Sequence, residues 1–280
     1  MSFRRIALIG KPRSAESESS LQQLREFLRK RGCEVLPEGE NAGSAKADLA
    51  IVIGGDGTML AAARDLVRHH VPLVGINQGR LGFMTDIGLH DMQTGIGAIL
   101  DGKYAIEERS LLDAEITRAG KSMLRTIALN EAVIGKGSQG RLIEFELRVD
   151  DEFVYRLRAD GIIVATPTGS TAYALSAQGP ILHPAVPALT LVPLNPHTLS
   201  ARPVSVSDRC RIDIVMVHSI DARAHFDGLA LHDMAEGDHL ILQRSADAVR
   251  FVHPPGYHYF ATLREKLGWS EAIEKRRATD

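Results

Sequence analysis

The sequence predicts an α/β domain followed by an all-β domain. Strand and helix patterns alternate over residues 1–100, which is typical of an open parallel sheet of the Rossmann-like kind. Residues 101–258 instead form short alternating strands separated by turns, which favours a β-sandwich-like domain. Helical spacing returns over residues 259–280, and we expect this segment to pack back on the first domain. A chain of 280 residues is long enough for two such cores.

The elements of the first domain follow from apolar periodicity. The pattern predicts a strand at 5–10, an amphipathic helix at 20–30, a strand at 49–53, a helix at 59–67 and a strand at 72–77. The run at 49–53 is apolar throughout, as in a strand that is buried on both faces. Ligands of such sheets bind beyond the carboxyl ends of the strands.

Alternation of apolar and polar residues predicts the strands of the second domain. We expect them at 113–117, 126–130, 142–149, 153–157, 211–217 and 239–243.

Composition excludes several classes of function. The net charge of −2 and the absence of a basic patch argue against nucleic acid as a partner. No apolar run approaches the ~20 residues that cross a bilayer, and no signal-peptide pattern is present, so we expect a cytoplasmic protein that does not bind membranes. Cys33 and Cys210 are isolated, and the histidines near residues 225 and 253 lack zinc-site spacing. A small-molecule partner is expected.

The turn around Asp56 is the first candidate site. Glycines at 54, 55 and 57 allow positive φ and close backbone approach, and a helix amino terminus follows, which favours a phosphate. The turn lacks the lysine of a Walker loop and the third glycine of a dinucleotide fingerprint. A carboxylate in an anion-binding turn would repel a phosphate unless it binds a metal or takes a proton, which suggests a catalytic role for Asp56. The alternative is that Asp56 is a turn or helix-capping residue.

A second candidate site lies at residues 158–176. Thr166 to Gly169 form a turn after a strand, and Ser170, Thr171, Tyr173 and Ser176 would line a groove with hydroxyl groups suited to a nucleotide. The alternative is a capped turn that merely begins a short helix.

Four motifs together resemble the bacterial NAD kinases over nearly the whole chain. They are Gly-Gly-Asp-Gly-Thr at 54–58, Asn-Glu at 130–131, the block 160–180 and the segment 191–203. The first motif is shared with lipid kinases and phosphofructokinases, whereas Asn-Glu combined with Thr-Gly-Ser-Thr-Ala-Tyr is specific. One departure is Gln178, where the family commonly has glycine.

The resemblance implies transfer of the γ-phosphoryl group of ATP to the 2′-hydroxyl of the adenosine ribose of NAD. The products are NADP and ADP, and a divalent metal, Mg²⁺, travels with ATP rather than on protein ligands. Asp56 would accept the hydroxyl proton, and Gly57 would bring backbone N–H groups near phosphate. Asn130 and Glu131 would bind NAD, although a solvated strand end is the alternative for this pair.

The remaining roles also come from the resemblance. Thr171, Ala172, Tyr173 and Ser176 match positions that hold the adenosine part, Asp160 matches one at the nicotinamide end, and Asp227 lies in a loop near the dinucleotide. In the loop after residue 76, Asn77 is expected to approach the phosphates and Arg80 to face the same crevice.

Arg141 and Arg158 would neutralise a substrate phosphate, or else form exposed salt bridges. The family also implies a homodimer or homotetramer.

Two functions of other classes stay open on the residues alone. A lipid kinase shares the glycine-rich turn but requires a surface for a lipid alcohol, and no strongly basic amphipathic helix is evident. A dinucleotide sensor would hold NAD(H) or NADP(H) in the same turns without phosphoryl transfer. Measuring NADP formed from NAD, ATP and magnesium separates the three.

Overall fold

The computed structural model describes residues 3–10, 15–37, 46–79, 82–228 and 230–269. It forms two compact units, one made of residues 1–108 and 249–280 and the other of residues 109–248. Two long strands, β6 (Ala105–Arg118) and β17 (His239–His253), run from one unit into the other. The sequence placed the domain borders at 100/101 and 258/259, whereas the units divide at 108/109 and 248/249, within these two strands.

The first unit is built on a parallel sheet with the order β2-β1-β3-β4, with β5 beside β4. The end of β17 joins β4 through the pair Phe251 and Leu73. The strands are β1 (Arg5–Gly10), β2 (Glu34–Val35), β3 (Leu49–Gly54), β4 (Leu73–Asn77) and β5 (Ile87–Gly88). The α-helices are α1 (Ala15–Lys30), α2 (Asp56–Leu66), α3 (Met92–Leu100) and α5 (Tyr259–Leu267). Residues 270–280 of the predicted terminal helix lie outside the described residues.

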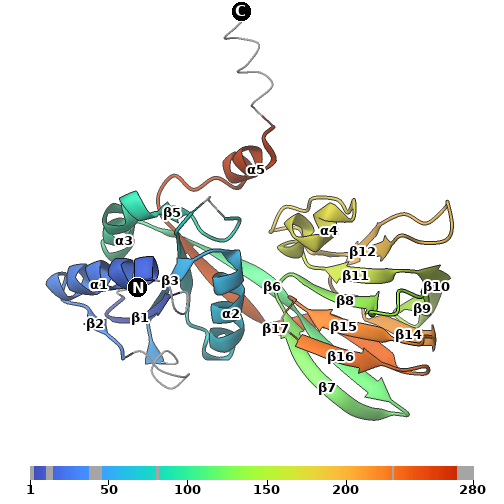
Figure 1. Ribbon diagram of the computed structural model, residues 1–280. Coiled ribbons are helices and arrows are strands. Elements are labelled where there is room, and N and C mark those ends of the chain that lie inside the picture. The colour runs from blue at the N-terminus through green and yellow to red at the C-terminus, as the bar shows by residue number, and fades with distance from the viewer. Residues whose placement is uncertain (1–2, 11–14, 38–45, 80–81, 229, 270–280) are drawn as a thin grey trace, which may run out of the picture. The chain divides into compact units, whose positions relative to one another are not determined.

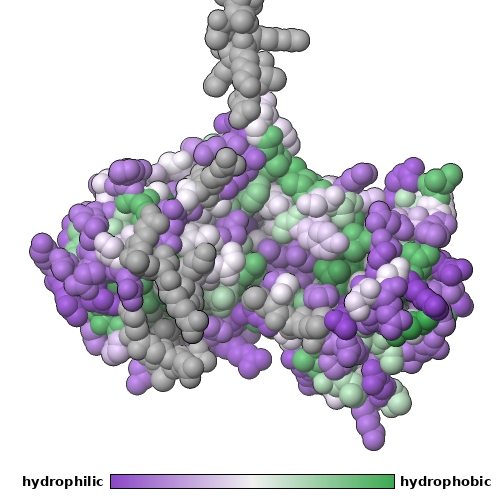
Figure 2. Space-filling view, in the orientation of Figure 1, coloured by the Kyte–Doolittle hydropathy of each residue, from purple (hydrophilic) through white to green (hydrophobic). Residues whose placement is uncertain are grey.

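Helices cover both faces of this sheet. Ile51 and Ile53 of β3 pack in one core with side chains of α1 and α3, while α2 packs on β3 from the other side (Figure 1). All six residues of β3 are buried, as the continuous apolar run predicts. The outer face of α1 is hydrophilic (Figure 2). Among the helices of the described residues, none combines the length and the apolar character needed to span a membrane.

The second unit consists of two antiparallel sheets that enclose one core. One sheet has the order β13-β12-β11-β8-β15-β16, and the other contains β10-β9-β14-β17 with the β6–β7 pair. Ile134 and Ile162 of the first sheet pack with Phe145 and Ile214 of the second. The remaining strands are β7 (Lys121–Ala128), β8 (Glu131–Lys136), β9 (Ile143–Val149), β10 (Glu152–Ala159), β11 (Gly161–Ala165), β12 (Ala188–Leu194), β13 (Val204–Ser207), β14 (Ile212–His218), β15 (Ala222–Phe226) and β16 (Ala230–Met234).

The predicted fold class is confirmed: a parallel sheet with helices precedes a two-layer, all-β arrangement. The predicted strands at 113–117 and 239–243 are parts of β6 and β17, which continue for 14 and 15 residues. Both cysteines are free thiols.

Candidate functional site

Asp56 is the first residue of α2, directly after β3 and Gly55. Its Oδ2 accepts the N–H of Phe83 and its Oδ1 accepts the N–H of Met84, both at 3.0 Å. The carboxylate therefore holds the loop that follows β4. This loop approaches so closely that a Cβ at Gly82 would lie 2.2 Å from Asp56 Oδ1, so a larger residue there would displace the carboxylate.

The glycine-rich turn differs from the sequence expectation in its backbone. None of the glycines at 54, 55 and 57 has a positive φ. Gly54 is needed for a different reason, because a Cβ there would lie 2.5 Å from Thr58 Oγ1. The helix also begins two positions before Thr58, at Asp56 itself. Gly57 is exposed in the first turn of this helix, before the first backbone hydrogen bond of the turn, from the Thr58 N–H to the Gly55 carbonyl.

Asn77 lies beside this turn, since it ends β4 in register with Gly54. Its Oδ1 accepts the N–H of Gly79 at 2.9 Å. Its Nδ2 is buried and has no hydrogen-bond partner among the described residues. An unsatisfied buried donor is costly, so this amide is suited to an acceptor oxygen of a ligand. Arg80, predicted to face the same crevice, lies outside the described residues.

The Asn130–Glu131 pair stands at the start of β8 in the second unit. Asp227, from the turn between β15 and β16, accepts the N–H groups of Leu129, Asn130 and Glu131 at 2.8, 2.7 and 3.1 Å. The Asp227 N–H in turn donates to the Glu131 carbonyl at 3.0 Å. Asp227 is only 8% exposed and has φ +52°. Its carboxylate therefore fixes the backbone of the pair.

The side chains of the pair are buried but incompletely bonded. Asn130 Oδ1 and Glu131 Oε2 find no hydrogen-bond partner within the described part of the chain. Burial, and then the nearby Asp227 carboxylate, raise the pKa of Glu131 to about 7, although a hydrogen bond from the Tyr173 backbone opposes the shift. The pair is thus not a solvated strand end. Two buried oxygens are available to hydroxyl or N–H donors.

The segment after β11 forms a short 3₁₀ turn at Gly169–Thr171 and the helix α4 at Tyr173–Ser176. The prediction that Ser170 lines a groove is wrong: it is buried, and its hydroxyl bonds the Pro167 carbonyl and the Leu182 N–H. The Thr171 hydroxyl donates to the Thr168 carbonyl at 3.1 Å. Ala172 is half-buried between the two helical turns.

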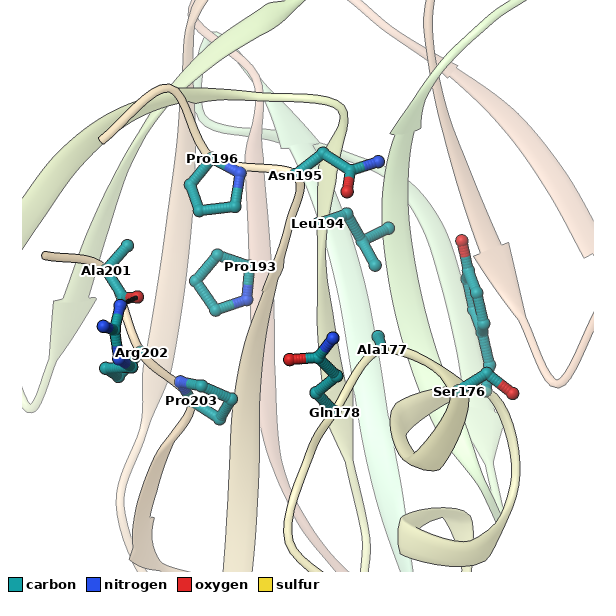
Figure 3. A pocket seen from close by; sticks show the side chains of 11 residues that line it. Ser176, Ala177, Gln178, Pro193, Leu194, Asn195, Pro196, Ala201, Arg202 and Pro203 are labelled. Atoms are coloured by element: carbon teal, nitrogen blue, oxygen red, sulfur yellow. Dashed lines mark hydrogen bonds between the residues drawn. The ribbon is translucent and has the colours of Figure 1, made fainter. Parts of the chain in front are cut away.

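Tyr173 and Ser176 line a cavity of about 470 Å³. The opposite wall is formed largely by the segment 193–203, whose prolines give it flat apolar surfaces (Figure 3). A cavity of this size and shape suits a planar ring.

Asp160 is engaged by neighbours of its own unit. Lys136 Nζ lies 2.6 Å from its Oδ1, and Asn195 Nδ2 donates to its Oδ2 at 2.9 Å. These two hydrogen bonds, that of Lys136 first, lower the pKa of Asp160. Arg141 and Arg158 are exposed, and neither forms an ion pair with a described residue. Their guanidinium groups are open to an anion.

Comparison with known protein families shows to which family this chain belongs. A model of the ATP-NAD kinase N-terminal domain matches residues 40–104, and a model of the C-terminal domain matches residues 129–254. The chain belongs to the ATP-NAD kinase family. The NAD kinase of Aromatoleum aromaticum is 55% identical over 96% of this chain and 95% of that protein. The NAD kinase of Azoarcus sp. (strain BH72) is 52% identical over 96% and 97%.

Solved structures of ATP-NAD kinase relatives share the fold. Yeast NADH kinase complexed with NADH matches with a TM-score of 0.89 and 23% identity, covering 96% of this chain and 88% of that one. The NAD kinase from Archaeoglobus fulgidus in complex with ATP matches with a TM-score of 0.77 and 26% identity, covering 93% and 99%.

Sequence reasoning missed one cluster in this member of the ATP-NAD kinase family. His253 is 3% exposed; its Nδ1 lies 2.5 Å from Asp86 Oδ2, its Nε2 lies 3.1 Å from Glu107 Oε2, and its ring stacks on Tyr257. Asp86 ends the loop that Asp56 holds, so the cluster anchors that loop at its other end. No local pattern reveals it, because the partners are far apart in sequence. Among the described residues, no group of three or more His, Cys, Asp or Glu side chains is arranged so that it could hold a metal ion; Asp86 and Glu107 contact opposite nitrogens of the His253 ring.

Proposed function

We propose that this chain transfers the γ-phosphoryl group of ATP to the 2′-hydroxyl of the adenosine ribose of NAD. The observation that carries the proposal is the Asn130–Glu131 pair, whose buried oxygens lack partners while Asp227 holds the backbone beneath them. Ribose hydroxyls are donors that such oxygens accept. Membership of the ATP-NAD kinase family supplies the reaction class.

In this proposal Asp56 accepts the proton of the attacking hydroxyl. The ribose oxygen forms a bond to the γ-phosphorus, the bond to the bridging oxygen of ATP breaks, and ADP leaves with that electron pair. A carboxylate within hydrogen-bond reach both orients the alcohol and takes its proton. The N–H groups of Phe83 and Met84 donate to the two oxygens of Asp56 and so fix the orientation of this carboxylate.

A divalent ion, Mg²⁺, belongs to the same proposal. Phosphate oxygens are its preferred ligands, so it would enter with ATP and neutralise charge on the phosphates. The first turn of α2 with Gly57, and the unpaired Asn77 amide, are suited to contact phosphate oxygens.

The other residues bind rather than react. We assign the adenosine part to Thr171, Ala172, Tyr173 and Ser176, and the nicotinamide end to Asp160. Arg141 and Arg158 are free to neutralise phosphate charge, and Asp227 becomes a positioning residue for the Asn130–Glu131 pair. We further propose that the chain self-associates as a dimer or tetramer, which light scattering on the purified protein tests.

The decisive experiment incubates the pure protein with NAD, ATP and Mg²⁺ and measures NADP with an NADP-dependent dehydrogenase. Asp56→Asn is expected to lower kcat by about 10²- to 10⁴-fold while the protein still binds NAD. Asp65→Asn, at an exposed position of the same helix, is the matched control and is expected to retain wild-type kcat.

Each other outcome has a definite meaning. NAD binding without NADP formation by the wild type would identify a sensor, and phosphorylation only of an added lipid alcohol would identify a lipid kinase. Undiminished turnover by Asp56→Asn would refute the role of Asp56 as proton acceptor.

A further inference from the structure

Gln178 has an unfavourable backbone conformation. It follows α4 with φ +63°, the left-handed region where helices usually place glycine. Its N–H bonds the Leu175 carbonyl, and the next N–H, of Gly179, bonds the Ala174 carbonyl, so the helix end enforces this geometry. A long side chain is disfavoured there, and strain of this kind gathers at functional sites.

Other residues with positive φ do not explain Gln178. Four of them, Asp150, Asp151, Asn195 and Asp227, have short polar side chains that tolerate the left-handed region, whereas His70 and Ala119, which lie outside the cavity lining, do not. Glutamine gains no such local compensation. The chain therefore accepts a strained backbone at a position where glycine would be free of strain.

The Gln178 side chain lies in the wall of the cavity that Tyr173 and Ser176 line. Its amide points into the space between the 193–203 segment and the end of α4 (Figure 3). No hydrogen bond joins this amide to any residue that the structure describes. A free donor and a free acceptor therefore face a cavity whose opposite wall carries three prolines together with Asn195 and Arg202.

We propose that Gln178 is a specificity-determining residue that reads the polar edge of a ring of the bound dinucleotide. A primary amide offers one acceptor and two donors, which complement a second amide-like edge. Two groups of NAD carry such an edge: the nicotinamide carboxamide and the amino side of adenine. That the ligand is NAD rests on the proposed function. The choice of Gln178 rests on its positive φ and on the direction of its side chain into the cavity.

Three variants separate the amide from the strained backbone. Gln178→Ala removes the amide and keeps the strain, Gln178→Gly removes both, and Ala119→Gly relieves a positive φ of 49° in a turn outside the cavity lining. The measurement is the Kd of NAD by calorimetry, with the melting temperature beside it.

Both Gln178 variants are expected to weaken NAD binding by about three- to tenfold, the range of a neutral hydrogen bond. Gln178→Gly should melt above Gln178→Ala, and Ala119→Gly should melt above wild type with an unchanged Kd. A Kd within about 1.5-fold of wild type in both Gln178 variants would overturn the proposal.

Two analogues identify the ring. Nicotinic acid adenine dinucleotide alters the carboxamide, and nicotinamide hypoxanthine dinucleotide alters the amino edge of adenine. For each analogue we compare its Kd with that of NAD, first in wild type and then in Gln178→Ala. The analogue whose ratio of Kd values to NAD is smaller in the variant than in wild type carries the edge that Gln178 contacts. If neither ratio differs between wild type and Gln178→Ala, the proposal is wrong.

Failure of the proposed function is distinguishable from failure of this inference. A wild type that binds NAD but forms no NADP would refute kinase activity and leave the Kd comparison decisive for Gln178. A wild type that binds no NAD would overturn both.

Discussion

Glu131 gives the sharpest test of the electrostatics at the candidate site. In the folded protein its pKa is raised from 4.5 to about 7, first by burial and then by the Asp227 carboxylate. We expect Glu131→Gln, which keeps the size of the side chain and removes its titration, to change how stability depends on pH.

The sign follows from linkage. The folded state holds the Glu131 proton more tightly than the unfolded state, so this group favours folding below pH 4.5. That contribution is lost as the pH rises through 7. A difference between 4.5 and about 7 corresponds to about 3 kcal/mol, because one pKa unit is about 1.4 kcal/mol.

Urea unfolding between pH 4.5 and pH 8 measures this contribution. Far-ultraviolet circular dichroism is the suitable signal, since Glu131 lies in the second unit and the single tryptophan, Trp269, in the first. From the lower to the higher pH, wild type is expected to lose up to about 3 kcal/mol relative to Glu131→Gln.

A matched variant controls for the loss of a carboxyl group. Glu152→Gln changes an exposed residue of the same unit and leaves Glu131 in place, so we expect this variant to keep the loss of stability that Glu131 causes in wild type. A difference between wild type and Glu131→Gln that is independent of pH would refute the assignment of a raised pKa.

Three further substitutions test contacts that hold the site. In wild type, burial lowers the pKa of His253, but hydrogen bonds to Asp86 and Glu107 outweigh this effect and raise the pKa above 6.5. The stability advantage of wild type over His253→Gln should be full below pH 6.5 and shrink as the pH rises through the folded pKa, as urea unfolding would measure. Asp227→Ala leaves three backbone N–H groups without their acceptor, and we expect a loss of about 3–5 kcal/mol and weaker NAD binding by calorimetry. Gly82→Ala pushes a Cβ against the Asp56 carboxylate, and kcat for NADP formation is expected to fall by about 10²-fold.

Each has a control of the same chemical kind. These are His69→Gln and Asp233→Ala at exposed positions, and Gly79→Ala in open space on the same loop as Gly82. A stability difference between wild type and His253→Gln that does not change with pH would contradict the first contact. A loss below about 1 kcal/mol in Asp227→Ala would contradict the second, and wild-type kcat in Gly82→Ala the third.

The sequence predicted those elements whose own residues show which of their faces are buried. The apolar run of β3 implies burial on both faces, and the spacing in α1 gives one apolar face, so both are visible in a single stretch of sequence. The extent of β6 and β17 was not predictable in this way. Their pairing partners change along their length, and the alternation observed at one point does not reveal where the strand continues.

The site was predictable as a set of positions and less so as a set of roles. Asn130 and Glu131 stand out by motif, but the burial that makes their oxygens costly to leave unpaired depends on packing. Asp227 matched a loop near the ligand, yet its contacts lie 96–98 residues away in sequence and identify it as a support for the backbone. Ser170 carries the same hydroxyl as Ser176, and only its burial distinguishes a structural hydroxyl from an exposed one.

The two turn aspartates bind backbone N–H groups with different consequences. Asp227 is 8% exposed and accepts three of them, so most of its accepting capacity is used to hold β8 in place. Asp56 is half-buried and accepts one N–H on each oxygen. Because a carboxylate oxygen accepts about two hydrogen bonds, each oxygen of Asp56 keeps one accepting site. The same side chain can therefore fix its loop and still accept a hydrogen bond from a hydroxyl group, whereas Asp227 uses both sites of Oδ1 and one of Oδ2 on the backbone of residues 129–131.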